Sequence, residues 1–144
     1  MKKTWAKKLL VTCGILVGVF LISWVAVGIS ISNEATWIIH SAYDTNGKRP
    51  KEMDNIISDR IYKRINYRDG GPPATEGTYN EVNKLSFVFA THNFFNATAH
   101  YRYTYDRSLK STGEKLSGSS NIPCKIFFKF ENGRWVVVGY YEPY

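Results

Sequence analysis

The chain has 144 residues, enough for about one domain, and a formal net charge of +7. Four of its 19 basic residues are lysines that precede a long apolar run, so residues 33–144 carry 15 basic against 12 acidic groups. The excess of positive charge is small, and no basic run is interleaved with aromatic residues. The sequence therefore excludes the charge pattern of a nucleic-acid-binding domain.

The apolar run, residues 9–31, contains no Asp, Glu, Lys, Arg or His. As a helix at ~1.5 Å per residue it spans about 35 Å, slightly more than the ~30 Å hydrocarbon core of a bilayer. The four lysines lie before it, whereas Asn33 and Glu34 follow it. Because positively charged flanks stay in the cytoplasm, we expect a single-pass protein of the cell membrane. Its parts are a cytoplasmic basic tip (1–8), a transmembrane anchor (9–31) and an extracytoplasmic domain (33–144).

Two alternatives stay open for this segment. A cleaved signal peptide also begins with basic residues, but its apolar stretch is usually about 7–15 residues long. A lipoprotein signal is suggested by Leu10-Val11-Thr12-Cys13, although the apolar run continues well past Cys13. We favour an uncleaved anchor. It places Cys13 in the bilayer and Cys124 outside it, so a disulfide within one chain is not expected.

Two short helices are predicted next. In the first, residues 34–44, Asn33 can cap the helix, which either stands alone or continues the membrane helix. In the second, residues 50–66, Pro50 fits the first turn. The apolar stripe of the second helix, which predicts core packing, consists of Met53, Ile56, Ile57, Ile61 and Ile65. A breaker-rich connection, residues 67–77, follows.

From there the period of the pattern changes to two, which is typical of antiparallel strands with one face on a core. A first strand alternates at Leu85, Phe87 and Phe89. In a second strand the expected core face consists of Ala97, Ala99, Tyr101, Tyr103 and Tyr105. A polar loop rich in Ser and Gly, residues 107–121, then leads to the last two strands.

The stretch KIFFKFENGRWVVVGYYEPY, residues 125–144, predicts a hairpin around Asn132-Gly133. Counting outward from a two-residue type I′ turn pairs Glu131 with Arg134 and fixes every later pair. One face, expected in the core, then holds Cys124, Ile126, Phe128, Phe130, Trp135, Val137 and Tyr141. The other face holds Phe127, Val136, Val138 and Tyr140, between Lys125 and Lys129. We expect this second face to be covered either by the same chain or by a partner.

Two helices followed by four antiparallel strands, closing on a hairpin of the form E-N-G-R-W-V-V-V, resemble the NTF2-like and cystatin-like group of α+β domains. The resemblance spans residues 34–144, and its sharpest parts are A-Y-D-T-N-G-K-R-P-K-E-M-D-N-I-I-S-D and G-R-W-V-V-V-G-Y. It implies two short helices packed on a curved four-stranded antiparallel sheet that forms a cone. Bacterial envelopes contain domains similar in layout behind one anchor, including assembly subunits of conjugation and secretion channels. A shared fold does not fix a function.

Enzymes of this group, similar to ketosteroid isomerases and scytalone-type dehydratases, use an Asp or His base and Tyr donors. The resemblance therefore implies His40 and Asp44 as weak catalytic candidates. Because these residues are four apart on one helix face, we favour a simple pairing between them. The histidines show no H-x-x-H or H-E-x-x-H spacing and no phosphate-binding loop is present, so we expect no metal and no cofactor.

The tyrosine row (Tyr101, Tyr103 and Tyr105) has three interpretations. It could line a ligand cavity, pack its rings with the hydroxyls in water, or form a protein–protein contact. We favour the second, and take the row and the second hairpin face together as the candidate binding residues.

The predicted function is a non-enzymatic, membrane-anchored binding or assembly module of a bacterial cell-envelope complex. Its partners would be the membrane and either another envelope protein or a second copy, not nucleic acid. The alternatives are a small-molecule-binding or enzymatic cone with a tyrosine-lined pocket, and an inhibitor or immunity-type domain.

Overall fold

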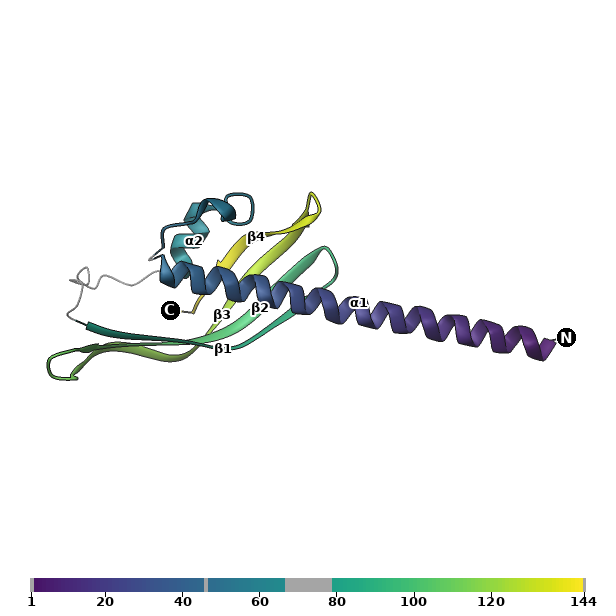
Figure 1. Cartoon of the computed structure of the whole chain (residues 1–144), viewed down its shortest axis with the longest axis horizontal. Coiled ribbons are helices and arrows are strands. Elements are labelled where there is room, and N and C mark those ends of the chain that lie inside the picture. Colours follow the sequence, from purple (N-terminus) through teal and green to yellow (C-terminus); the bar gives the residue numbers. More distant parts are fainter. Residues whose placement is uncertain (1, 46, 67–78, 144) are drawn as a thin grey trace.

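The computed structural model describes residues 2–45, 47–66 and 79–143. In these ranges the chain forms a long helix α1 (Lys2–Asp44), a 3-10 turn η1 (Lys51–Met53) and a short helix α2 (Asp59–Ile65). Four strands follow: β1 (Tyr79–His92), β2 (Asn96–Leu109), β3 (Lys115–Glu131) and β4 (Arg134–Tyr141). They form one antiparallel sheet in the order β1-β2-β3-β4 (Figure 1). The predicted α+β class and the apolar N-terminal helix are confirmed. The predicted connection of residues 67–77 lies outside the described residues.

The predicted membrane segment and the first short helix are a single helix, α1. Neither Gly nor Pro lies between Ile29 and Asp44, so nothing interrupts its hydrogen bonds. Beyond its end Gly47 adopts a φ of +75°, and its N–H donates to the Ala42 carbonyl at 2.9 Å. The N-terminal part of α1 projects beyond the sheet (Figure 1). Its length and composition fit either a membrane anchor or a signal sequence.

The C-terminal part of α1 covers one face of the sheet. Its buried stripe consists of Ile31, Ala35, Ile38, Ile39 and Ala42. Opposite this stripe lie the core-facing residues of β2 and β3, which are Ala97, Ala99, Tyr101, Cys124, Ile126 and Phe128. These six predicted core positions are thereby confirmed, whereas Tyr103 and Tyr105, predicted on the same face of β2, are only half-buried. Tyr62 joins α2 to α1, because its hydroxyl lies 3.0 Å from Ser41 Oγ and 2.9 Å from Thr45 Oγ1.

The prediction of a single helix over residues 50–66 is wrong, because Ile56 and Ile57 are not helical. The Val137 N–H of β4 donates to the Ile56 carbonyl at 2.7 Å, and Ile57 forms an isolated parallel bridge with Val137. This backbone pairing extends the sheet beyond the β4 edge. Helix α2 then begins at Asp59, and Ser58 caps it, because the Ser58 side chain accepts a hydrogen bond from the Ile61 N–H.

The prediction of a polar loop over residues 107–121 is also wrong. Strands β2 and β3 continue through it, with Arg107 opposite Ser117, and turn only between Leu109 and Lys115. The β3 residues from 115 to 121 are all exposed. The polar composition of this segment therefore reflects a hairpin that projects past the core, not a loss of strand structure.

A register irregularity in β1 reverses a predicted face. Between Ser86 and Phe89 the pairing with β2 shifts, so Phe89 does not share the core side with Leu85. Val88 and Ala90 pack against the core instead, whereas Phe89 is 43% exposed.

The C-terminal hairpin follows the predicted register only near its turn. Asn132 and Gly133 have φ values of +52° and +80°, as a type I′ turn requires, and Glu131 pairs with Arg134. The pairs of Phe130 with Trp135 and of Phe128 with Val137 are confirmed.

Beyond Val137 the predicted pairs are wrong, because β4 contains one extra residue, Val138, as a β-bulge. Phe127 pairs with Gly139 and Ile126 with Tyr140, one residue later than predicted. After the bulge, the residues of β4 therefore lie on the opposite sheet faces from those predicted. Tyr140 is buried and Tyr141 is 50% exposed. Phe130, which was also expected in the core, is 41% exposed at the hairpin tip.

Candidate binding surface

The sheet face opposite α1 is the open face of the domain, here called the outer sheet face. It is defined by Phe89, His100, Lys125, Phe127, Val136, Val138 and Tyr141. Four of these apolar side chains are at least 37% exposed, namely Phe89, Phe127, Val138 and Tyr141. Because Phe127, Val138 and Tyr141 gather on one side of the neighbouring strands β3 and β4, this face has the composition of a contact surface.

The bulge at Val138 shapes this surface. Without it Val138 would continue the alternation of β4, and Phe127 would lie opposite a branched side chain. Instead Phe127 lies over Gly139, where an added Cβ would come within 3.1 Å of Phe127 Cδ2. The glycine thus accommodates the Phe127 ring, and Val138 stands 53% exposed beside it.

Basic side chains accompany the apolar ones. Lys125 pairs with His100 across β2 and β3, and its Nζ lies 6.0 Å from the centre of the Tyr141 ring. The His100 ring stacks on Phe89 at 4.8 Å. Partial burial and the nearby Lys125 charge both lower the pKa of His100 below its usual range. The imidazole is therefore neutral at pH 7, and the permanent charges here are cationic.

A second group of predicted residues meets on the covered side of the sheet. Tyr101 and Tyr103 of β2 and Tyr140 of β4 converge on Glu142 and Cys124. Tyr103 Oη donates to Glu142 Oε1 at 2.6 Å and Tyr140 Oη donates to Oε2 at 2.8 Å. The Tyr101 hydroxyl lies 3.4 Å from that of Tyr140, which is itself 3.8 Å from Cys124 Sγ.

This tyrosine–glutamate cluster favours neutral phenols. Burial is the main cause that raises the pKa of Tyr101, Tyr103 and Tyr140 above the usual tyrosine value. Burial also raises the pKa of the Cys124 thiol to about 11. At neutral pH the phenols are donors and the thiol is protonated, so these groups are suited to holding a carboxylate, not to nucleophilic attack.

The remaining predicted site residues lie elsewhere. Tyr105 pairs with Asn83 and Ser119, further toward the β2–β3 turn. His40 and Asp44 are both exposed, on the side of α1 away from the core. No ion pair between these two is found in the part of the chain that the structure describes.

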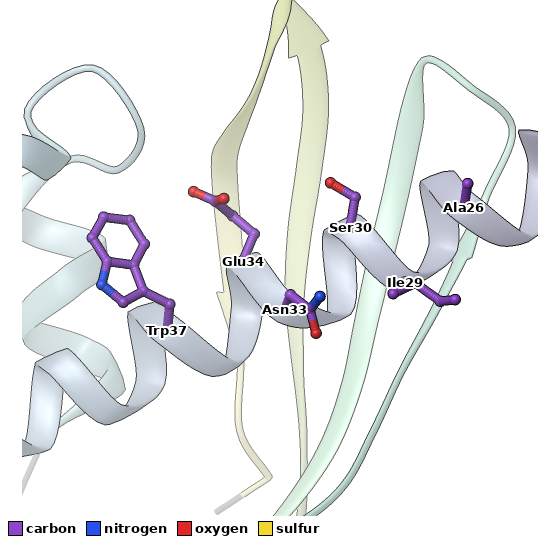
Figure 2. Close-up of a pocket in the computed structure, with 6 residues that line it drawn as sticks. All are labelled: Ala26, Ile29, Ser30, Asn33, Glu34 and Trp37. Atoms are coloured by element: carbon purple, nitrogen blue, oxygen red, sulfur yellow. The ribbon is translucent and has the colours of Figure 1, made fainter.

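A shallow open groove of about 440 Å³ lies along α1. Its lining residues occupy successive turns of this one helix, as Figure 2 shows: Ala26, Ile29, Ser30, Asn33, Glu34 and Trp37. Partial burial raises the pKa of Glu34. None of the predicted catalytic or binding residues lines this groove.

In residues 2–45, 47–66 and 79–143, no three His, Cys, Asp or Glu side chains come together as a metal site.

Sequence reasoning missed three residues of these two groups. Alternation alone places Phe89 and Tyr141 in the core. The bulge in β1 has no local signal, whereas the bulge at Val138 has a weak one in Gly139, since a glycine inside a strand often marks a bulge. Glu142 belongs to no periodic pattern. Its only sequence signal is that it is a carboxylate directly after a tyrosine-rich strand, where it can accept hydrogen bonds from phenols.

No family model, no curated protein and no solved structure matches the chain. The NTF2-like and cystatin-like resemblance stays a prediction.

Proposed function

We propose that the protein is a membrane-anchored binding or assembly module that docks a protein partner on its outer sheet face. The anchor is the N-terminal part of α1, with its N-terminus in the cytoplasm and the sheet outside, in a bacterial cell envelope. The fold would be of the NTF2-like or cystatin-like type. The observation that carries the proposal is the exposed apolar group Phe127, Val138 and Tyr141 beside Lys125.

The chemistry of this face indicates what kind of partner fits it. Lys84, Arg102 and Lys125 are exposed on β1, β2 and β3, respectively, and no ion pair neutralises them in the described residues. Lys129 is paired with Glu131 at 2.8 Å. A partner that offers an apolar ridge flanked by Asp or Glu would match both the apolar group and the free cations.

A photocrosslinker placed at Val138, in membranes of cells that make the full chain, tests this proposal. The matched control is Leu116, which is 47% exposed on the projecting part of β3. We expect one adduct of defined mass from position 138 and none from position 116. The adduct should be lost when Lys125→Glu is added, because the charge reversal repels an acidic partner.

Recovery of the monomer alone from position 138 would contradict the docking proposal. An adduct of twice the chain mass would identify a second copy as the partner. An inhibitor or immunity-type role is a special case, in which the adduct contains an enzyme whose activity falls on binding.

The enzymatic alternative has less support. A base has to reach a substrate proton within hydrogen-bonding distance, together with the groups that orient the substrate. His40 and Asp44 are exposed on α1, whereas the tyrosines are buried or half-buried, and Glu142 already accepts the hydrogen bonds of Tyr103 and Tyr140.

A further inference from the structure

The turn between β1 and β2, residues 92–96, lies against the apolar helix at a position that the sequence assigns to the bilayer. The His92 ring stacks on Trp24 with the ring centres 4.3 Å apart, and a His92 ring nitrogen lies 2.9 Å from the Trp24 carbonyl oxygen. Phe94 meets Trp24 edge-on at 5.0 Å and Phe20 at 5.7 Å. The sheet is therefore fixed to α1 well inside residues 9–31.

The backbone of this turn is built to present aromatic side chains. Phe94 has a φ of +68°, in the left-handed region where Gly or Asn is favoured and a bulky residue is uncommon. The Asn93 side chain holds the turn by accepting the N–H groups of Phe95 and Asn96, at 3.2 and 2.8 Å. A phenylalanine in this conformation is explained by its contacts with α1, because the backbone alone would favour a smaller residue.

The next residue of the turn, Phe95, is 68% exposed. Its carbonyl accepts the Phe130 N–H at 2.7 Å, which joins the β1–β2 turn to the β3–β4 hairpin. Both hairpins point toward the N-terminal part of α1, as Figure 1 shows. The sequence of the turn, HNFFN, carries no Asp, Glu, Lys or Arg.

The depth of the helix in a bilayer follows from these contacts. If residues 9–31 all lay in hydrocarbon, the polar backbone of the turn would be in hydrocarbon too, at a cost of several kcal/mol for each unsatisfied group. The hydrocarbon must therefore end near Trp24, whose ring suits the interface. Residues 9–24 as a helix span only ~24 Å, short of the ~30 Å core. Long flanking lysines and local thinning of the bilayer can accommodate this difference.

We propose that the β1–β2 turn is a second membrane contact, in which Phe94 and Phe95 sit at the headgroup–acyl boundary of the outer leaflet beside Trp24. This inference rests on the anchor of the proposed function. The bilayer is the expected occupant because the turn is continuous with the membrane helix through Trp24 and Phe20. The domain then rests on the membrane surface, with the β2–β3 turn farthest from it.

Depth-dependent quenching tests this placement. The full chain is labelled at a single cysteine with nitrobenzoxadiazole and inserted, one copy per nanodisc, into lipids carrying a doxyl group at acyl carbon 5 or 12. Three samples are compared: native Cys13 for the anchor, Phe95→Cys and Ser111→Cys, the last two in a Cys13→Ala background. Buried Cys124, with its raised thiol pKa, stays unlabelled, and Cys13→Ala alone measures this background.

We expect the label at 95 to lose fluorescence more strongly to carbon-5 than to carbon-12 doxyl, and the label at 111 to be unaffected by either. The label at 13 should be quenched more by carbon 12. If position 95 behaves like position 111 while position 13 is quenched, the second contact is disproved and the anchor stands. If position 13 is not quenched, the membrane anchor is disproved, and the proposed second membrane contact is disproved with it. Because each nanodisc holds one copy, a second chain cannot protect position 95.

Discussion

Tyr103 and Glu142 connect two strands that are not neighbours in the sheet. Tyr103 lies on β2 and Glu142 directly follows β4, yet the phenol donates to the carboxylate at 2.6 Å across the intervening β3. Tyr140 holds the other carboxylate oxygen at 2.8 Å. The end of the described chain is thereby fixed against the covered face of the sheet.

Tyr103→Phe should lower the free energy of unfolding of the sheet domain by about 1.5–3 kcal/mol, because it removes a hydrogen bond to a charged group. Glu142→Gln should cost a comparable amount, and the double variant should cost less than the sum, since both changes remove the same contact. Chemical unfolding followed by near-ultraviolet circular dichroism measures these values. Tyr105→Phe, outside the cluster, is the matched control; additive effects of the two changes would contradict the coupling.

Phe127 and Phe128 are adjacent residues with opposite roles. Phe128 is 1% exposed, so Phe128→Ala should destabilise the domain by about 3–5 kcal/mol. Phe127→Ala should cost far less, because its ring lies on the outer sheet face, but it should weaken the crosslink from position 138. Equal losses of stability in the two variants, measured by the same unfolding experiment, would refute the assigned faces.

Gly118→Ala should destabilise the β2–β3 hairpin by about 1–3 kcal/mol. A Cβ at this position would lie 2.8 Å from the Tyr105 carbonyl oxygen, a backbone atom that cannot move without breaking the strand pairing. Hydrogen exchange of the β2 amides near the turn should accelerate in this variant. Ser117→Ala, at an exposed neighbouring position, should leave exchange unchanged.

The lowered pKa of His100 predicts a pH dependence of stability. Because the folded state binds this proton less readily than the unfolded state, stability is fully present above the ordinary histidine pKa of about 6.5. It should fall as the pH drops from there through the lowered folded-state value. Titration of the imidazole by NMR checks the direction, and His100→Gln identifies the signal. In that variant the dependence in this window should be reduced, and an unchanged profile would assign it to other groups.

The two cysteines should differ in reactivity. Cys124 is buried with a thiol pKa of about 11, so a maleimide at pH 7 should not modify it in the folded protein. Cys13 is exposed on α1 and should react in detergent. Mass spectrometry after short labelling, with and without denaturant, distinguishes the sites. Rapid modification of Cys124 without denaturant would show that its surroundings open readily.

Some features of this fold are determined locally and can therefore be predicted from sequence. The apolar run of α1 contains no proline, and Asn132-Gly133 supplies the positive φ values of a tight turn. Alternation in β2 assigns Ala97, Ala99 and Tyr101 to the core. Each of these depends on residues within a few positions of one another.

Other features depend on contacts between distant residues, and only the tertiary structure decides them. Ile56 and Ile57 have a helical pattern, but pairing with Val137 interrupts the helix there. The bulge at Val138 is indicated locally only by Gly139, which does not fix its position. The bulge nevertheless turns Tyr140 toward Glu142 and leaves Tyr141 on the outer sheet face. The contact of the β1–β2 turn with Trp24 joins positions 68 residues apart. Burial and pairing across such separations favour one register over others that are equally consistent with the local pattern.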